Sequence, residues 1–324
     1  MSTAGVDDSA VIATNDDAAS CKRFAVQQGY WKDPYIQHLV RPGERKAPEI
    51  NRGYYARTQG VRQLLDQFLR LTRCECQVVS LGAGFETTYW RLKDEGLLPR
   101  GYFEVDFPAV TSRKCHYIRS RPPLSKPLTE GGGQLQIEGG TLHCSQYHIL
   151  SGDLRNTEEL DASLTTSGID KSLPTLFMTE CVLVYLTPEQ SSKLVRWAAD
   201  NFPTAMFVNY EQVNMKDKFG QVMIENLKTR HCHLAGVDLC ADAESQKQRF
   251  LSVGWEGAEL LDMWTVYHSL PQQDVQRIER LEFLDEVELL QQLLQHYCIT
   301  WAWKDPRGLG LASLGFGQPS PALR

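Results

Sequence analysis

Residues Gln77–Trp90 read QVVSLGAGFETTYW, an apolar run that breaks at glycines and continues in a helix-like pattern. The run Val78–Leu81 has the residues of a buried strand, and Gly82 and Gly84 follow it. Open α/β sheets bind ligands at the carboxyl ends of their strands, where glycine permits a tight turn and a close approach. A dinucleotide site is disfavoured because Thr87 stands where G-x-G-x-x-G has its third glycine, and no G-x-x-x-x-G-K-[ST] phosphate loop occurs. The turn alone therefore indicates a nucleotide-like ligand only weakly.

The chain around this turn alternates strand and helix patterns. Apolar residues at i, i+3, i+4, i+7 and i+8 predict an amphipathic helix before the turn, over Val61–Leu69. Thr187-Pro-Glu-Gln predicts a capped helix start. The alternation predicts an α/β fold with a parallel sheet and helices on both faces. The predicted strands are Val78–Leu81, Tyr102–Val105, Tyr147–Ser151, Leu176–Thr179, Ala205–Tyr210 and a closing strand at 297–303.

The last third of the chain is richer in helix. Helices are predicted from about Lys216 to His231 and over Ser245–Ser252, and an apolar stripe from Phe283 to Tyr297 predicts another. Because the closing strand follows these extra helices, we expect a helical insertion near the end of the sheet. The composition predicts a disordered acidic tail over residues 1–20 and a flexible Gly/Pro-rich tail over residues 311–324.

The overall composition limits the possible functions. The 324 residues are 42% hydrophobic and 23% charged, with a net charge of −6, which argues against a dedicated nucleic-acid binder. No run of 18 apolar residues and no signal peptide is found, so we expect no membrane association and a cytoplasmic protein. Nine scattered cysteines lack zinc-site spacing and are expected to be reduced thiols without a metal.

Three acidic residues follow predicted strands on the same edge of the sheet as the glycine turn. Asp106 ends YFEVD, Asp153 follows the strand at 147–151, and Glu180 follows the strand at 176–179. Each alone could be a surface acid or a helix cap. Together they provide acceptors for ribose hydroxyls, an adenine amino group and an ammonium. This combination predicts S-adenosylmethionine, which has no phosphate.

Long blocks of the sequence carry a more specific signal. CKRFAVQQGYWKDPYIQHLV, KAPEINRGYYAR, LGAGFETTYWRL, YFEVDFP, TECVLVYLTPEQ and NYEQVNMKDKFGQVMIENL together resemble the leucine carboxyl methyltransferase family. The resemblance spans about Cys21 to Trp303. It implies a Rossmann-like class I S-adenosylmethionine-dependent methyltransferase domain over residues 21–310, with a helical lid formed by N-terminal and late elements. It also implies methylation of the C-terminal leucine of the protein phosphatase 2A catalytic subunit. We expect the enzyme to be a monomer, although the sequence leaves its oligomeric state open.

The resemblance implies a role for particular positions. Gly82 lies in the cofactor loop, to which the glycine turn itself adds Gly84 as a candidate, Asp106 holds the ribose, and Asp153 with Leu154 meets the adenine. Glu180 lies beside the methionine part, and Lys22 and Arg57 join the same pocket. Whether these two cations contact the cofactor, the substrate carboxylate or both stays open.

Three residues are candidates for catalysis. Arg57 extends the apolar stripe of its helix, and two interpretations are open. Its guanidinium group binds a carboxylate with two hydrogen bonds, or its side chain packs along the helix end and keeps its charge in solvent. Tyr185 and Tyr210 are read as pocket walls or as core residues.

The implied reaction is a direct displacement by a carboxylate. A peptide α-carboxyl group has a pKa of about 3.3–3.7, so the nucleophile is ionised at neutral pH and no general base is required. Three alternatives remain: a small-molecule or tRNA carboxylate methyltransferase, a nicotinamide oxidoreductase, and a non-catalytic binding module. The tRNA-modifying relatives carry an additional repeat domain.

Overall fold

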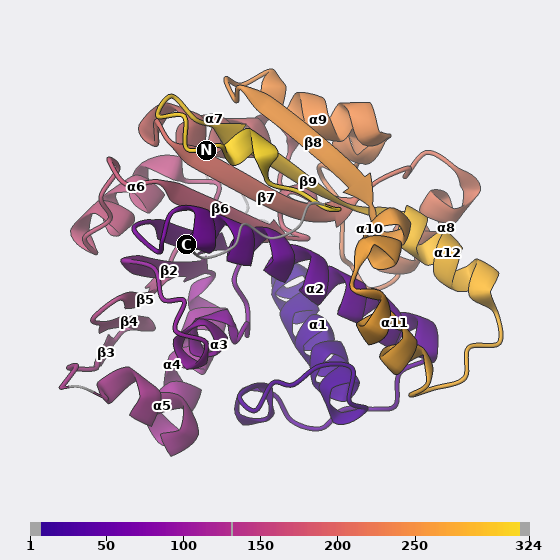
Figure 1. Ribbon diagram of the computed structural model, residues 1–324, viewed down its shortest axis with the longest axis horizontal. Helices are drawn as coiled ribbons and strands as arrows, with labels where there is room; N and C mark the ends of the chain where they lie inside the picture. The colour runs from indigo at the N-terminus through magenta and orange to yellow at the C-terminus, as the bar shows by residue number, and fades with distance from the viewer. Residues whose placement is uncertain (1–7, 131, 318–324) are drawn as a thin grey trace, which may run out of the picture.

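The computed structural model describes residues 8–130 and 132–317, and its sheet and helices form a layered α/β architecture (Figure 1). The strands are β1 Gln77–Leu81, β2 Gly101–Asp106, β3 Gln136–Glu138, β4 Thr141–Cys144, β5 Tyr147–Ser151, β6 Thr175–Glu180, β7 Ala205–Gln212, β8 Gly257–Asp262 and β9 Tyr297–Lys304. The α-helices are α1 Ser9–Gln27, α2 Pro48–Leu71, α3 Thr88–Asp94, α4 Pro108–Ser120, α5 Pro122–Thr129, α6 Thr157–Thr166, α7 Pro188–Asn201, α8 Lys218–Lys228, α9 Ala243–Leu251, α10 Met263–Ser269, α11 Gln272–Glu279 and α12 Val287–Gln295. Short 3₁₀ helices are η1 Ile36–His38, η2 Leu183–Tyr185, η3 Val237–Cys240 and η4 Leu311–Ser313.

All nine described strands belong to one sheet, in the order β3-β4-β5-β2-β1-β6-β7-β9-β8. The strands β5, β2, β1, β6 and β7 are parallel, whereas β9 runs antiparallel between β7 and β8. The chain leaves β1 for β2 on one side and later returns to β6 on the other. The carboxyl end of β1 is therefore the switch point at which open α/β sheets bind ligands.

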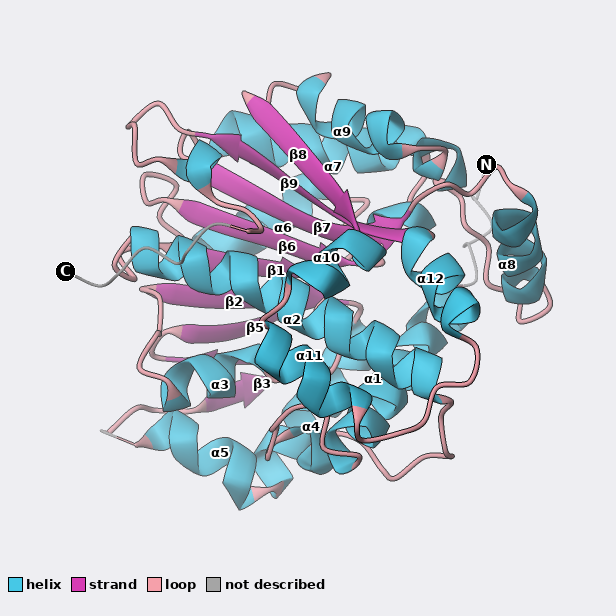
Figure 2. Ribbon diagram, turned by 45° about the vertical axis from the view of Figure 1, so that its right-hand side comes forward, coloured by secondary structure: helices cyan, strands magenta, loops and turns pink. Residues whose placement is uncertain are grey.

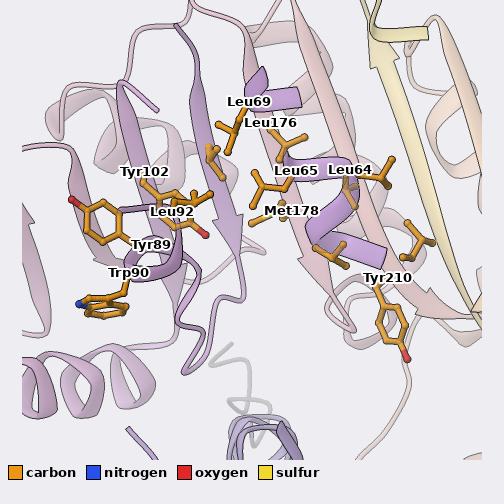
Figure 3. Packing of buried hydrophobic residues seen from close by; sticks show 14 of the residues in the cluster. Leu64, Leu65, Leu69, Tyr89, Trp90, Leu92, Tyr102, Leu176, Met178 and Tyr210 are labelled. Carbon is orange, nitrogen blue, oxygen red and sulfur yellow. The ribbon is translucent and has the colours of Figure 1, made fainter. Parts of the chain in front are cut away.

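Helices cover both faces of this sheet, as predicted. Figure 2 shows α2 crossing one face, with α6, α7 and α9 on the other. In Figure 3, Leu64, Leu65 and Leu69 of α2 face Leu176 and Met178 of β6. These side chains are buried in one continuous cluster, so the predicted stripe of α2 is the face that holds it on the sheet. The fold is the Rossmann-like class I arrangement that the sequence predicted.

Local signals found several elements of the fold but misplaced some of their ends. The capping box predicted at Thr187 is present, because Gln190 N donates to Thr187 Oγ1 at 3.2 Å and Thr187 N donates to Gln190 Oε1 at 3.0 Å. The predicted stripe from Phe283 to Tyr297 is correct only for α12. Phe283 is 84% exposed outside the helix, and Tyr297 begins β9. The helix predicted to reach His231 ends at Lys228.

The prediction of a disordered tail over residues 1–20 is wrong for its described part. Residues from Ser9 onward form the first half of α1, and residues 1–7 lie outside the described residues. The acidic side chains of this segment have cationic partners on the body of the protein. Asp8 pairs with Arg155 at 2.6 Å, and Asp16 pairs with Arg113 at 2.8 Å. Composition alone does not show such partners.

The flexible tail predicted at residues 311–324 is likewise wrong for residues 311–317, while residues 318–324 lie outside the described part. Leu311 and Leu314 are buried. Gly315 exchanges two hydrogen bonds with Gln67 of α2, at 2.8 and 3.0 Å. The indole Nε1 of Trp301 donates to Leu314 O at 3.0 Å. This segment is therefore packed against α2 and β9.

Candidate active site

A cavity of about 290 Å³ opens at the carboxyl ends of β1, β2, β5 and β6. Its floor is formed by the loops after these strands, and α1 and α2 contribute further walls. Almost every site residue predicted from sequence lines it: Lys22, Arg57, Gly82, Gly84, Asp106, Asp153, Leu154, Glu180 and Tyr185. The sheet thus gathers residues that lie up to 163 positions apart, from Lys22 to Tyr185. Tyr210 is not among the lining residues.

The glycine turn is shaped by backbone conformation and by close packing. Gly82 and Gly84 have φ angles of +69° and +55°, which side chains with a Cβ disfavour. A Cβ on Gly82 would lie 2.5 Å from Val182, and one on Gly84 would lie 2.5 Å from Asn15 Oδ1. Asn15 also accepts a hydrogen bond from Phe85 N at 2.9 Å. Helix α1 therefore lies directly over the turn.

Asp106 is held by the backbone of the same turn. Its carboxylate accepts hydrogen bonds from Gly84 N and Phe107 N, both at 2.7 Å. Burial raises the pKa of this carboxyl group, against the lowering effect of the two N–H donors. A carboxylate offers about four acceptor positions, so further donors such as ribose hydroxyls can still be accommodated.

Glu180 forms the most strongly charged part of the cavity. Its Oε2 lies 2.6 Å from Arg57 Nε and 3.1 Å from Lys22 Nζ. Burial raises the pKa of the Glu180 carboxyl, but the two cations outweigh it and bring that pKa to about 2. Arg57 is 8% exposed, and its pKa is raised well above its ordinary value because Glu180 outweighs the opposing effect of burial. The cluster contains two cations and one anion, and the buried Glu86, which also lines the cavity, interacts electrostatically with Glu180 and Lys22.

The opposite end of the cavity contains a second ion-pair cluster. Asp153 is paired with Arg155, whose Nη2 lies 2.7 Å from Asp153 Oδ2 and 2.6 Å from Asp8 Oδ2. Partial burial raises the pKa of Asp153, but Arg155 lowers it below its ordinary value overall. Leu154, which lies between Asp153 and Arg155 in the sequence, is buried. Sequence reasoning missed Arg155 and Asp8, although an arginine two positions after a candidate binding acid was a usable signal.

Some aromatic residues of the site line the cavity, and one packs behind the lining residues. Tyr185 lines the cavity, together with Tyr54 and Tyr297, which sequence reasoning did not identify. Tyr210 instead stacks on Tyr297, with ring centroids 5.3 Å apart, and the Arg57 guanidinium lies 4.7 Å from its ring centroid. Burial raises the pKa of Tyr54, Tyr185 and Tyr210. These phenols keep their protons at neutral pH.

The arrangement suits the binding of a cationic donor next to an anion. Acidic groups at three strand ends supply acceptors, and the Lys22–Glu180–Arg57 cluster supplies cations for a carboxylate. Among the described lining residues there is no histidine, and burial raises the pKa of Cys181 to about 12. Within residues 8–130 and 132–317, no group of three or more His, Cys, Asp or Glu side chains is placed to hold a metal ion. In the same part of the chain, no helix has the length and apolarity needed to cross a membrane.

Known proteins are similar to this chain in fold and in sequence. A candidate methyltransferase from Thermobifida fusca superposes with a TM-score of 0.54 at 15% identity, covering 90% of this chain and 94% of its own. The sequence pattern of the leucine carboxyl methyltransferase family matches residues 10–199. Leucine carboxyl methyltransferase 1 of Bos taurus is 56% identical over 313 residues, which is 96% of this chain and 94% of the relative. The tRNA wybutosine-synthesizing protein 4 of Homo sapiens is 39% identical over 90% of this chain and 43% of that protein.

The family match and the nearly full-length relatives show that the chain is an S-adenosylmethionine-dependent methyltransferase, and its fold agrees with that class. Within that class, the chain belongs to the leucine carboxyl methyltransferase family.

Proposed function

We propose that this enzyme methylates the α-carboxylate of the C-terminal leucine of the protein phosphatase 2A catalytic subunit, acting as a cytoplasmic monomer. The family and the close relatives support a leucine carboxylate as the acceptor. The single observation that carries the proposal is the cluster of Lys22 and Arg57 around Glu180. The two cations line the cavity, where they can pair with an incoming carboxylate.

The polar side chains that line the cavity fit S-adenosylmethionine. Asp106 would accept from the ribose hydroxyls, and Asp153 with Leu154 would meet the adenine. Gly82 and Gly84 would allow close approach, while Glu180 would lie beside the methionine ammonium, with Lys22 and Arg57 near the carboxylates. When bound, S-adenosylmethionine supplies an electrophilic methyl group. The fit rests on acceptors for hydroxyls, an amine and an ammonium.

Protein groups in this mechanism position reactants and exclude water. The substrate carboxyl group, with a pKa of about 3.3–3.7, is already ionised at neutral pH. No group of this chain has to remove a proton, which fits the raised pKa of Cys181 and of the tyrosines. Arg57 and Lys22 would hold the carboxylate in line, and Tyr185 would wall the cavity. Tyr210 would act through Arg57, on which its ring packs. In-line positioning would supply most of the acceleration.

Two measurements test the proposal. Calorimetry should detect binding of S-adenosylmethionine and none of NAD. Methyl transfer should occur to the intact phosphatase catalytic subunit and disappear when its terminal leucine is deleted. Equal transfer to the truncated subunit would overturn the leucine assignment, and absence of S-adenosylmethionine binding would overturn the whole proposal.

The similarity to the tRNA wybutosine-synthesizing protein favours one alternative, a carboxylate on tRNA. This chain spans 43% of that relative, and its net charge of −6 offers no general attraction to nucleic acid. Methyl transfer to tRNA in place of the phosphatase would replace the proposed substrate while keeping the proposed chemistry.

A further inference from the structure

Arg155 connects two carboxylates that belong to different parts of the molecule. Asp153 follows β5, whereas Asp8 is the residue that precedes the first turn of α1. Arg155 Nε lies 2.8 Å from both oxygens of Asp153, and Nη2 lies 2.7 Å from Oδ2. On its other side, Nη1 and Nη2 reach the two oxygens of Asp8 at 3.1 and 2.6 Å. One guanidinium therefore makes two forked contacts at once.

The forks constrain both carboxylates. The Asp153 carboxylate also accepts from Arg155 N at 2.9 Å, so its orientation is fixed from two directions. Asp8 makes no side-chain capping hydrogen bond to α1, so its carboxylate is directed to Arg155 instead. The side chains of Asp8 and Arg155 are 22% and 26% exposed, and that of Asp153 is 38% exposed. Bidentate contacts of this kind add geometric specificity to charge attraction.

The cavity that contains this cluster also has apolar lining residues. Ile12 of α1, Phe107, Val110 and Leu154 are among them. Arg155 lies 5.8 Å from the centroid of the Phe107 ring. Adenine presents an amino donor at the position where hypoxanthine presents a carbonyl acceptor. A fixed carboxylate accepts from the amino group and repels the carbonyl.

We propose that Arg155 is the positioning residue of the adenine end of the cavity: it fixes the Asp153 carboxylate for the adenine amino group and, through Asp8, fastens α1 over the bound cofactor. This inference rests on the proposed function, in which Asp153 meets the adenine. It gives two separable roles to the two forks. The paired contacts between Arg155 and Asp153 determine the preference for adenine over hypoxanthine. The paired contacts between Arg155 and Asp8 determine how slowly the cofactor dissociates.

The test compares S-adenosylhomocysteine with S-inosylhomocysteine, which differ in the amino or carbonyl group at C6 and in the proton that the inosine base carries on the adjacent N1. Dissociation constants are measured by calorimetry, and dissociation rates by stopped-flow displacement, on the full chain. Wild type is expected to prefer the adenine compound by about tenfold or more. In Arg155→Ala the preference is expected to fall below about threefold, because Asp153 loses its orientation. Arg155→Lys should recover part of the preference, since lysine keeps the charge but not the fork.

Two further variants separate the roles. Asp8→Asn keeps a residue suited to the start of a helix but removes the charge, so it should keep the preference and speed cofactor release. Asp16→Asn breaks a different ion pair of α1, the one with Arg113, and leaves Asp153 untouched. It serves as the matched control and should keep the wild-type preference. If Arg155→Ala does not fold, Arg155→Lys and Asp8→Asn decide the question in the same way.

The outcomes distinguish this inference from the proposed function. A wild type that binds neither compound overturns both. A wild type that prefers the adenine compound, with an equal preference in Arg155→Ala and Arg155→Lys, overturns the role of Arg155 alone. A loss of preference in Asp16→Asn as large as in Arg155→Ala also overturns it, because any loosening of α1 would then suffice.

Discussion

The two ends of the cavity each hold a carboxylate against cations, but in different environments. At one end Glu180 is 19% exposed, and its partners Lys22 and Arg57 come from two helices far away in sequence. At the other end Asp153 is 38% exposed, and its partner Arg155 lies two positions further along the chain. Helix α1 contributes to both ends, with Asp8 at one and Lys22 at the other.

This difference shows how burial sets the strength of similar contacts. Water screens the charges at Asp153, whereas Glu180 depends on its two cations to remain ionised in a largely dry site. Removing a cation near Glu180 therefore leaves a poorly solvated charge. Removing the cation near Asp153 mainly frees the Asp153 side chain to be solvated by water. The first end should be essential for chemistry, and the second for recognition.

Arg57→Ala should show the largest effect. Loss of one partner of a buried, hydrogen-bonded charge pair is expected to lower kcat/KM for a leucine-ended peptide by about a hundredfold or more. The fold should persist, because Lys22 still pairs with Glu180. Arg52→Ala is the matched control: Arg52 is a buried arginine of the same helix that donates to Glu282 O at 3.1 Å and does not line the cavity. It should keep activity, and an unfolded Arg57→Ala protein would make Arg57 structural.

The pH dependence of stability should separate Glu180 from other carboxylates. Its pKa is about 2, below the ordinary 4.5, so its ionised form stabilises the fold above pH 4.5 and this contribution is lost as pH falls toward 2. The contribution is at most about 3 kcal/mol. Urea unfolding of wild type and Glu180→Gln should give a constant difference from pH 5 to 7 that shrinks by pH 3. A difference that stays constant down to pH 3 would contradict the buried ion pair.

Asp106 lies between the two ends and is held by backbone N–H groups rather than by cations. Asp106→Ala should weaken S-adenosylmethionine binding by about 1–3 kcal/mol, the cost of leaving buried polar partners unpaired. Calorimetry measures the change, and the midpoint of thermal unfolding shows whether the turn is intact. An unchanged dissociation constant in a folded variant would reject its role at the ribose.

Asp16→Asn should show the smallest effect. The side chains of Asp16 and Arg113 are 50% and 42% exposed, so their ion pair is worth less than about 1 kcal/mol. The small loss of unfolding free energy should disappear at high salt. A loss of several kcal/mol in the free energy of unfolding would show that α1 depends on exposed ion pairs as strongly as on the pair of Lys22 with Glu180. Burial would then not explain the difference between the two ends of the cavity.

Particular elements show where sequence reasoning succeeds. The strands β1, β2, β5, β6 and β7 were predicted because they are buried on both faces and read as apolar runs. The strands β3, β4 and β8 were missed, because all three are only partly buried, and β3 and β8 are the two edge strands of the sheet. Phe283 was assigned to a buried stripe by its chemistry, yet it is exposed beyond the helix.

The sequence by itself determined the sheet, the glycine turn and the family, because these depend on local patterns and on long matching blocks. The tertiary structure decided which charges meet. Arg57 and Glu180 are 123 positions apart, and Asp8 and Arg155 are 147 apart. The acidic N-terminal segment that forms α1 meets Arg155, Arg113 and the backbone N–H of Phe85 in the folded chain. Charge pairing over such separations depends on three-dimensional placement, and no local pattern encodes it.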